Sequence, residues 1–103
     1  MSLDVNDANF DEVINKAELP VLVKFWAPWC GPCRALAPVV DAVAAELEGK
    51  VQVVNVNVDD NPSIPTRYGI RAVPTFILFK NGELVEQLVG VVNKDALKEL
   101  AGK

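Results

Sequence analysis

Residues 21–27 are apolar at every position but one, and this run constrains the fold more than any other stretch of the chain. A strand with apolar side chains on both faces has to be covered on both sides, which is typical of a central strand in a parallel sheet. Residues 32–48 then carry apolar side chains on one helical stripe, with Pro32 suited to the first turn and Gly49 to the C-terminal cap. A second buried strand is predicted at residues 51–58, and the order strand, helix, strand indicates a right-handed parallel unit.

The rest of the chain adds a hairpin and two helices around this unit. Asn81-Gly82 predicts that a strand at residues 75–80 turns back into an antiparallel strand at residues 83–90. The two terminal helices are predicted from a polar cap followed by apolar residues at helical spacing: Asn6 or Asp7 before Phe10, Val13 and Ile14, and Asn93 before Ala96, Leu97, Leu100 and Ala101. The expected fold class is α/β, a mixed central sheet sandwiched between helices, in a single domain of residues 1–103.

Charge and hydropathy exclude several classes of partner. The formal net charge of −4 and the pI of about 4.7 argue against nucleic acids and anionic membranes, because phosphate binding needs clustered Lys and Arg. No apolar run approaches the ~18 residues that span a bilayer, and residues 1–10 show no signal-peptide pattern. We therefore expect a cytoplasmic protein with neither a membrane nor a nucleic acid as its partner.

Histidine is absent, and Cys30 and Cys33 are the two cysteines of the chain. The absence of histidine excludes Cys–His catalysis, a Ser–His–Asp triad and a Cys/His zinc site, because zinc takes four ligands. We expect no metal and no cofactor.

The two cysteines stand where a predicted central strand gives way to a predicted helix, a position at which sites collect in open α/β sheets. The unpaired N–H groups and partial positive charge of a helix N-terminus would stabilise a thiolate on Cys30 and lower its pKa. Cys33 lies one turn further in, so the pattern predicts an exposed attacking thiolate and a shielded resolving thiol. Two inert buried thiols, or half of a metal site shared across a dimer, are the alternatives.

Two tryptophans flank this motif. Trp29 lies in the loop between Pro28 and Cys30, which favours a half-exposed apolar rim that docks substrates over a place in the core. Trp26 lies in the strand, and we expect it to pack around the site.

Three separated stretches resemble the signatures of the thioredoxin family. Residues 25–34, Phe-Trp-Ala-Pro-Trp-Cys-Gly-Pro-Cys-Arg, are similar to its active-site sequence, and residues 68–75 resemble a second signature that holds a cis proline. Residues 79–82 resemble the family's hairpin, and residues 89–90 its third active-site loop. The resemblance covers essentially the whole chain and implies a thioredoxin-like fold and a protein-disulfide reductase, a dithiol–disulfide electron carrier.

The resemblance also implies roles. Cys30 attacks a substrate disulfide, and Cys33 then attacks Cys30 and releases the reduced substrate. The residues implied to receive the substrate are Trp29, Gly31, Pro32, Val73, cis Pro74 and Gly90. The implied partners are disulfide-containing proteins and a flavin-dependent, NADPH-driven thioredoxin reductase, and we expect a monomer. Two alternatives stay open: a redox-independent protein-binding module, and an oxidant or isomerase of the same fold.

Lys24 departs from the family pattern. Thioredoxins usually have a buried aspartate at this position, which handles the proton of the resolving cysteine, and a lysine where this chain has Asn55. Strand alternation puts Lys24 on the face that the helix after Cys30 covers. Two hypotheses follow: the ammonium group reaches water while the stem is buried, or the amine takes over proton handling.

Overall fold

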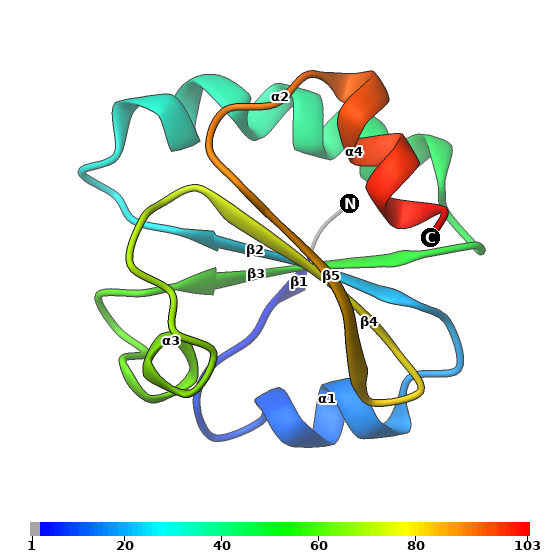
Figure 1. Ribbon diagram of the computed structural model, residues 1–103, viewed down its shortest axis with the longest axis horizontal. Helices are drawn as coiled ribbons and strands as arrows, with labels where there is room; N and C mark the ends of the chain where they lie inside the picture. The colour runs from blue at the N-terminus through cyan, green and yellow to red at the C-terminus, as the bar shows by residue number, and fades with distance from the viewer. Residues whose placement is uncertain (1–2) are drawn as a thin grey trace.

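A computed structural model describes residues 3–103, which form a mixed five-stranded sheet between helices (Figure 1). The strands are β1 (Leu3–Asp4), β2 (Val21–Trp26), β3 (Gln52–Asn57), β4 (Thr75–Lys80) and β5 (Glu83–Val89). The helices are α1 (Phe10–Lys16), α2 (Gly31–Glu46), α3 (Ser63–Arg67) and α4 (Lys94–Ala101). The predicted α/β class with a helix-covered mixed sheet is thereby confirmed.

β2 is the central strand, in the order β1-β3-β2-β4-β5. β3 runs parallel to it on one side and β4 antiparallel to it on the other. All of β2 is buried except Trp26, which is half-buried, as the two-sided apolar run predicts. Because β4 is antiparallel, its first residues lie beside the last residues of β2. This places residues 73–74, just before β4, close to Cys30, just after β2.

Two cores cover the two faces of the sheet. In Figure 1, α2 and α4 lie above the sheet, and α1 and α3 lie below it. The upper core consists of Leu22, Leu36, Val40, Val43, Ala44, Val51, Val53, Phe76, Leu78, Leu97, Leu100 and Ala101. The lower core consists of Val5, Phe10, Ile14, Val21, Val23, Phe25, Val54, Val56, Ile64, Ile77 and Phe79. Alternate residues of β2 therefore serve opposite cores, because side chains along a strand point to alternate faces.

Local signals set several boundaries as predicted. Asn93 caps α4, since its Oδ1 accepts the Ala96 N–H at 2.8 Å. Asn81 and Gly82 both have positive φ, 53° and 80°, which is the geometry of a tight hairpin turn. The helix predicted to end at residue 48 stops at residue 46 instead. A turn over residues 47–50 follows, with Gly49 at φ 83°.

The N-terminal region contains features that the pattern did not predict. Asn6 and Asn9 cap the turn before α1 reciprocally, each side-chain oxygen accepting the other's N–H at 2.8 and 2.9 Å. Asp7, the alternative cap, instead accepts the N–H groups of Ser63 and Ile64 at 3.1 Å and so caps α3. The two-residue strand β1, which pairs with β3, was also not predicted.

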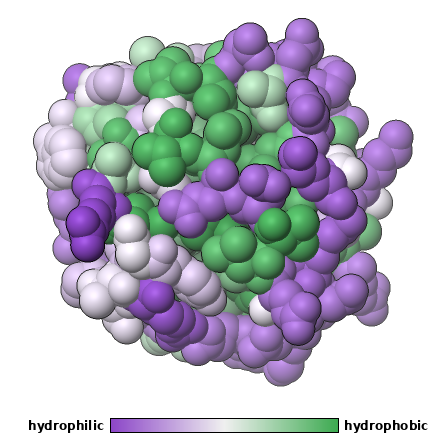
Figure 2. Space-filling model, in the orientation of Figure 1, coloured by the Kyte–Doolittle hydropathy of each residue, from purple (hydrophilic) through white to green (hydrophobic). Residues whose placement is uncertain are grey.

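β5 is an edge strand whose side chains are largely exposed. Three of the large apolar side chains that it exposes are Leu84, Val85 and Val89, and apolar patches interrupted by polar side chains appear on the corresponding face in Figure 2. Its pairing with β4 is irregular at residues 78–79, and it carries Glu83 and Glu86. A bulge and charges of this kind protect a sheet edge from pairing with another chain.

Candidate active site

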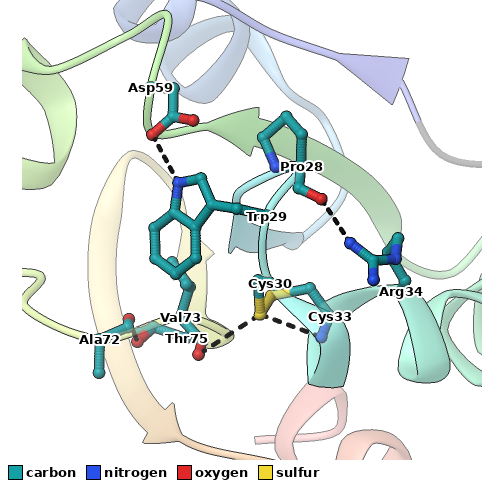
Figure 3. Close-up of a disulfide and its surroundings, with 9 residues drawn as sticks. All are labelled: Pro28, Trp29, Cys30, Cys33, Arg34, Asp59, Ala72, Val73 and Thr75. Carbon is teal, nitrogen blue, oxygen red and sulfur yellow. Dashed lines mark hydrogen bonds between the residues drawn. A yellow bond between two sulfur atoms is a disulfide. The ribbon is translucent and has the colours of Figure 1, made fainter.

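Cys30 and Cys33 form a disulfide at the N-terminus of α2, with their Cα atoms 5.3 Å apart (Figure 3). Cys30 is the N-cap residue and has an extended backbone, so its sulfur turns back over the first turn of the helix. The N–H of Cys33 donates to the Cys30 Sγ at 3.1 Å. After reduction, a thiolate on Cys30 would keep this donor and face the positive end of the helix dipole.

Both sulfur-bearing residues are buried in the disulfide form. Cys30 is 4% exposed and Cys33 is 1% exposed. The expectation of an exposed Cys30 is therefore wrong for this state, although Cys30 is the more accessible of the two. The two cysteines pack in a small apolar cluster with Ala27 and the half-buried Trp26 and Val73, which confirms that Trp26 packs around the site.

The loop before β4 forms one wall of the site. The carbonyl oxygen of Val73 lies 3.7 Å from the Cys30 Sγ, close enough to accept from the thiol once the disulfide is reduced. The Val73–Pro74 peptide bond is cis, as the resemblance implies. Gly90 donates its N–H to the Pro74 carbonyl at 2.9 Å. Pro74 and Gly90, two predicted site residues far apart in the sequence, are thus linked next to Val73 and Cys30.

Gly90 has a φ of 101°, a backbone conformation that side-chain-bearing residues rarely adopt. A Cβ built on Gly90 would meet nothing within 4 Å, so the space in front of it is open. Gly31 and Pro32 are exposed in the first turn of α2, between the two cysteines. A Cβ built on Gly31 would likewise meet nothing within 4 Å, so the space next to Gly31 is open as well.

Trp29 forms the apolar rim that its loop position predicts. Its side chain is 67% exposed, and its indole Nε1 donates to Asp59 Oδ1 at 3.1 Å (Figure 3). A hollow of about 140 Å³ lies between Trp29 and the loop before β4. Its lining residues are Trp29, Val58, Pro65, Ile70, Arg71, Ala72 and Val73. The hollow is lined mainly by apolar side chains, and Val73 is common to it and to the cluster around the two cysteines.

Lys24 lies on the α2 side of the sheet, as strand alternation predicts, and is 7% exposed. It is in register with Asn55 on β3, which is itself in register with Asp4 on β1, so a polar row crosses three strands. The Lys24 Nζ lies 5.8 Å from the centroid of the Trp26 ring. Burial lowers the pKa of Lys24 below its ordinary value of 10.5, and the carboxylates of Asp41 and Asp4 partly oppose this.

Sequence reasoning did not assign two polar contacts of the site. Asp59 fixes the Trp29 indole from the end of β3. Arg34, on α2, donates through Nη1 to the carbonyl oxygen of Pro28 at 2.7 Å. Arg34 follows Cys33 directly and ends the stretch that resembles the family's active-site sequence, and this position was the signal that could have identified it.

Within residues 3–103, no three His, Cys, Asp or Glu side chains are grouped so as to hold a metal ion. In the same part of the chain, no helix has both the length and the apolar character needed to cross a bilayer.

Comparisons with known proteins agree on one family. The family model described as Thioredoxin matches residues 1–103. Thioredoxin of Porphyra purpurea is 52% identical over 99 residues, which is 96% of this chain and 92% of that protein. Thioredoxin of Synechocystis sp. is 55% identical over 93 residues, 90% of this chain and 87% of that protein. The chloroplastic M-type thioredoxin of Pisum sativum is 48% identical over 99 residues, 96% of this chain and 58% of that protein.

Proposed function

The chain belongs to the thioredoxin family and is a dithiol–disulfide oxidoreductase, and we propose that Cys30 is its attacking thiol and Cys33 its resolving thiol. The observation that carries this assignment is the hydrogen bond from the Cys33 N–H to the Cys30 Sγ at the start of α2. A negative charge on Cys30 would keep that donor and lie at the positive helix end. Cys33, further inside and less exposed, has no such position.

The reaction conserves atoms and electrons in two exchanges. The Cys30 thiolate attacks one sulfur of a substrate disulfide, and the other substrate sulfur leaves as a thiolate that takes a proton. Cys33 then loses its proton and attacks the Cys30 sulfur of the mixed disulfide. The second substrate sulfur leaves, the substrate has gained two electrons, and the protein holds the Cys30–Cys33 disulfide seen in the structure.

The substrate segment lies, in this proposal, along the open side of the disulfide. Trp29 and its neighbouring hollow receive an apolar side chain, and Val73, Pro74 and Gly90 form the opposite wall. Gly31 and Pro32 border the same space from the first turn of α2. Support comes from the exposure of Trp29 and from the open space in front of Gly90.

Lys24 is proposed to handle the proton that Cys33 loses. A buried thiol ionises reluctantly, and the chain has no histidine to accept its proton. Lys24 is on the α2 side of β2, and its pKa is lowered by burial, which makes a neutral amine more accessible. Trp26 packs against the cysteine cluster and also lies beside the Lys24 amine, so the amine and the two cysteines share this neighbour.

The proposed partners are proteins that carry accessible disulfides and, as the source of electrons, an NADPH-driven thioredoxin reductase. We propose that the chain acts as a monomer in the cytoplasm. The charged and bulged edge strand β5 supports a monomer, because such edges resist pairing between copies.

The assignment of the two cysteines is tested by partial alkylation of the reduced protein. Iodoacetamide near neutral pH is expected to label Cys30 well before Cys33, as read by mass spectrometry of the peptides. Cys33→Ser should retain rapid labelling at Cys30 and should trap the mixed disulfide with insulin, whereas Cys30→Ser should trap nothing. Preferential labelling of Cys33 in the wild type would overturn the assignment.

A further inference from the structure

Residues 27–30 form the loop segment that ends at Cys30. One hydrogen bond within this segment and several from residues outside it hold it in place. Within the segment, the Cys30 N–H donates to the Ala27 carbonyl at 3.1 Å and closes a turn. Arg34 supplies two further bonds, from its backbone N–H to the Cys30 carbonyl at 3.2 Å and from Nη1 to the Pro28 carbonyl at 2.7 Å. Arg34 is therefore bonded on both sides of Trp29, whose indole is fixed separately by Asp59.

The Pro28 carbonyl gives Arg34 a specific point of attachment. Proline has no N–H, so this oxygen is the only hydrogen-bonding group of the Pro28 backbone. Arg34 is an exposed residue, and Figure 3 shows its guanidinium turned back along the helix toward Pro28. A cation in the first turns of a helix is disfavoured by the helix dipole, and the first turn of α2 has no acidic residue to offset it. The bond to Pro28 is the contact that holds the guanidinium there.

We propose that Arg34 is a positioning residue, which fixes the Trp29–Cys30 segment through the Pro28 carbonyl so that the apolar rim and the attacking sulfur meet a protein disulfide together. The proposal rests on Cys30 being the attacking thiol. The proposal also predicts a difference between two reactions of Cys30. The rate with a small reagent, which needs only the sulfur, should depend less on Arg34 than the rate with a protein disulfide. The fixed positive charge near Cys30 has a separate effect, since it favours the thiolate for both kinds of reagent.

The experiment compares these two reagents at one pH in four proteins: wild type, Arg34→Met, Arg34→Lys and Lys50→Met. Arg, Lys and Met are all good helix formers, so the exposed helix position is preserved. Lys50→Met is the matched control, because it removes one positive charge beyond the far end of α2. Asp59, which accepts from the Trp29 indole, and Arg71, which lines the hollow beside Trp29, are charged groups near the segment, and they stay unchanged in every variant. The measured quantities are the rate of insulin-disulfide reduction and the rate of Cys30 alkylation by iodoacetamide.

For Arg34→Met, the ratio of insulin reduction to alkylation should fall about 2- to 10-fold, the effect of one hydrogen bond on a rate. Arg34→Lys should restore much of this ratio, and Lys50→Met should leave it at the wild-type value. Loss of the charge should also raise the pH midpoint of alkylation by about 0.2 to 0.7 unit in Arg34→Met. The amide nitrogen of Trp29, which shares its peptide group with the Pro28 carbonyl, should shift in the nitrogen–proton NMR spectrum.

An unchanged ratio in Arg34→Met, an equal fall in Lys50→Met, no recovery in Arg34→Lys or an unmoved Trp29 amide would each overturn the proposal. The failure of the underlying assignment would look different, because the wild type itself would then be alkylated first at Cys33.

Discussion

The two faces of the sheet bury different kinds of side chain. The face under α1 and α3 holds an aromatic cluster in which Phe10, Tyr68 and Phe79 have ring centroids 5.4 to 5.9 Å apart. The face under α2 and α4 holds Lys24, the one charged side chain that is buried within the described part of the chain. It is also the face of the helix that begins at the disulfide. Both faces are packed with apolar side chains, but the α2 face also buries a charged group, on the side of the sheet where the disulfide begins its helix.

The two faces therefore contribute differently to stability and to redox chemistry. Phe10, Tyr68 and Phe79 lie outside the apolar cluster around the two cysteines, so substitution of these rings should act on stability and not on the redox site. At position 24, on the α2 face, an apolar residue should give the more stable fold, whereas lysine is the residue proposed to handle a proton. Stability and redox behaviour should thus respond differently to substitutions on the two faces, and four substitutions, at residues 79, 24, 67 and 11, test that separation.

The largest effect is expected on the aromatic face. Phe79→Ala removes a fully buried ring from the Phe10 and Tyr68 cluster, and the free energy of unfolding should fall by about 3 to 5 kcal/mol. Urea denaturation of the oxidised protein measures this loss. The reduction potential of the protein that remains folded should equal the wild-type value. A shift in potential as large as that of a variant at the disulfide would remove the separation between the faces.

An intermediate effect of opposite sign is expected for Lys24→Met. Burial lowers the folded-state pKa of Lys24 below 10.5, so protonation of Lys24 costs the folded state stability at pH values below 10.5. Methionine should therefore raise the free energy of unfolding, by on the order of 1 kcal/mol. Between the lowered pKa and 10.5 the unfolded state binds more protons, so wild-type stability rises with pH and the advantage of methionine shrinks there. A difference independent of pH would show that the charge of Lys24 is not its cause.

The same variant tests the proposed proton handling. Single-turnover reduction of a protein disulfide from about pH 5 to about pH 9 should be slower in Lys24→Met at the step that releases substrate from the mixed disulfide. Superimposable rate profiles in the two proteins would mean that Lys24 only reaches toward water and that solvent takes the proton.

The smallest effect is expected at the surface of the aromatic face. Arg67 pairs with Asp11 through two hydrogen bonds that join α3 to α1, and both side chains are exposed. A double-mutant cycle with Arg67→Met and Asp11→Ala should give a coupling energy of about 0 to 1 kcal/mol, lower still at high salt. A larger coupling would mean that this face owes part of its stability to charge as well as to packing.

Features governed by short stretches of sequence could be predicted. The two-sided apolar pattern identified β2, and helical spacing identified the inner side of α2. The Asn93 cap and the Asn81-Gly82 turn act within a few residues, so their chemistry is complete in the local sequence. The cysteine pair was likewise recognisable, because a helix N-terminus is a local feature.

Features that join distant parts of the chain could not be predicted from pattern. Asp7 is a good cap for the nearest helix, yet its partners lie more than fifty residues away on α3. The burial of Cys30 depends on Val73, and the hydrogen bond of Trp29 depends on Asp59. The strand register that sets Lys24 beside Asn55 depends on how β2 and β3 pair. A single sequence carries no signal of these pairings.

Because β4 runs antiparallel to β2, Cys30 is covered by Val73, a residue that is synthesised well after it. Val73 follows Cys30 by 43 residues. At roughly 5 to 20 residues per second, a ribosome needs about 2 to 9 seconds to synthesise that interval. A nascent chain therefore carries its complete Cys-Gly-Pro-Cys sequence for seconds before the carbonyl that shields it exists. The motif and the wall of its site can therefore meet only after the chain has been synthesised through β4, so the geometry around Cys30 is completed by folding and not by the Cys-Gly-Pro-Cys segment alone.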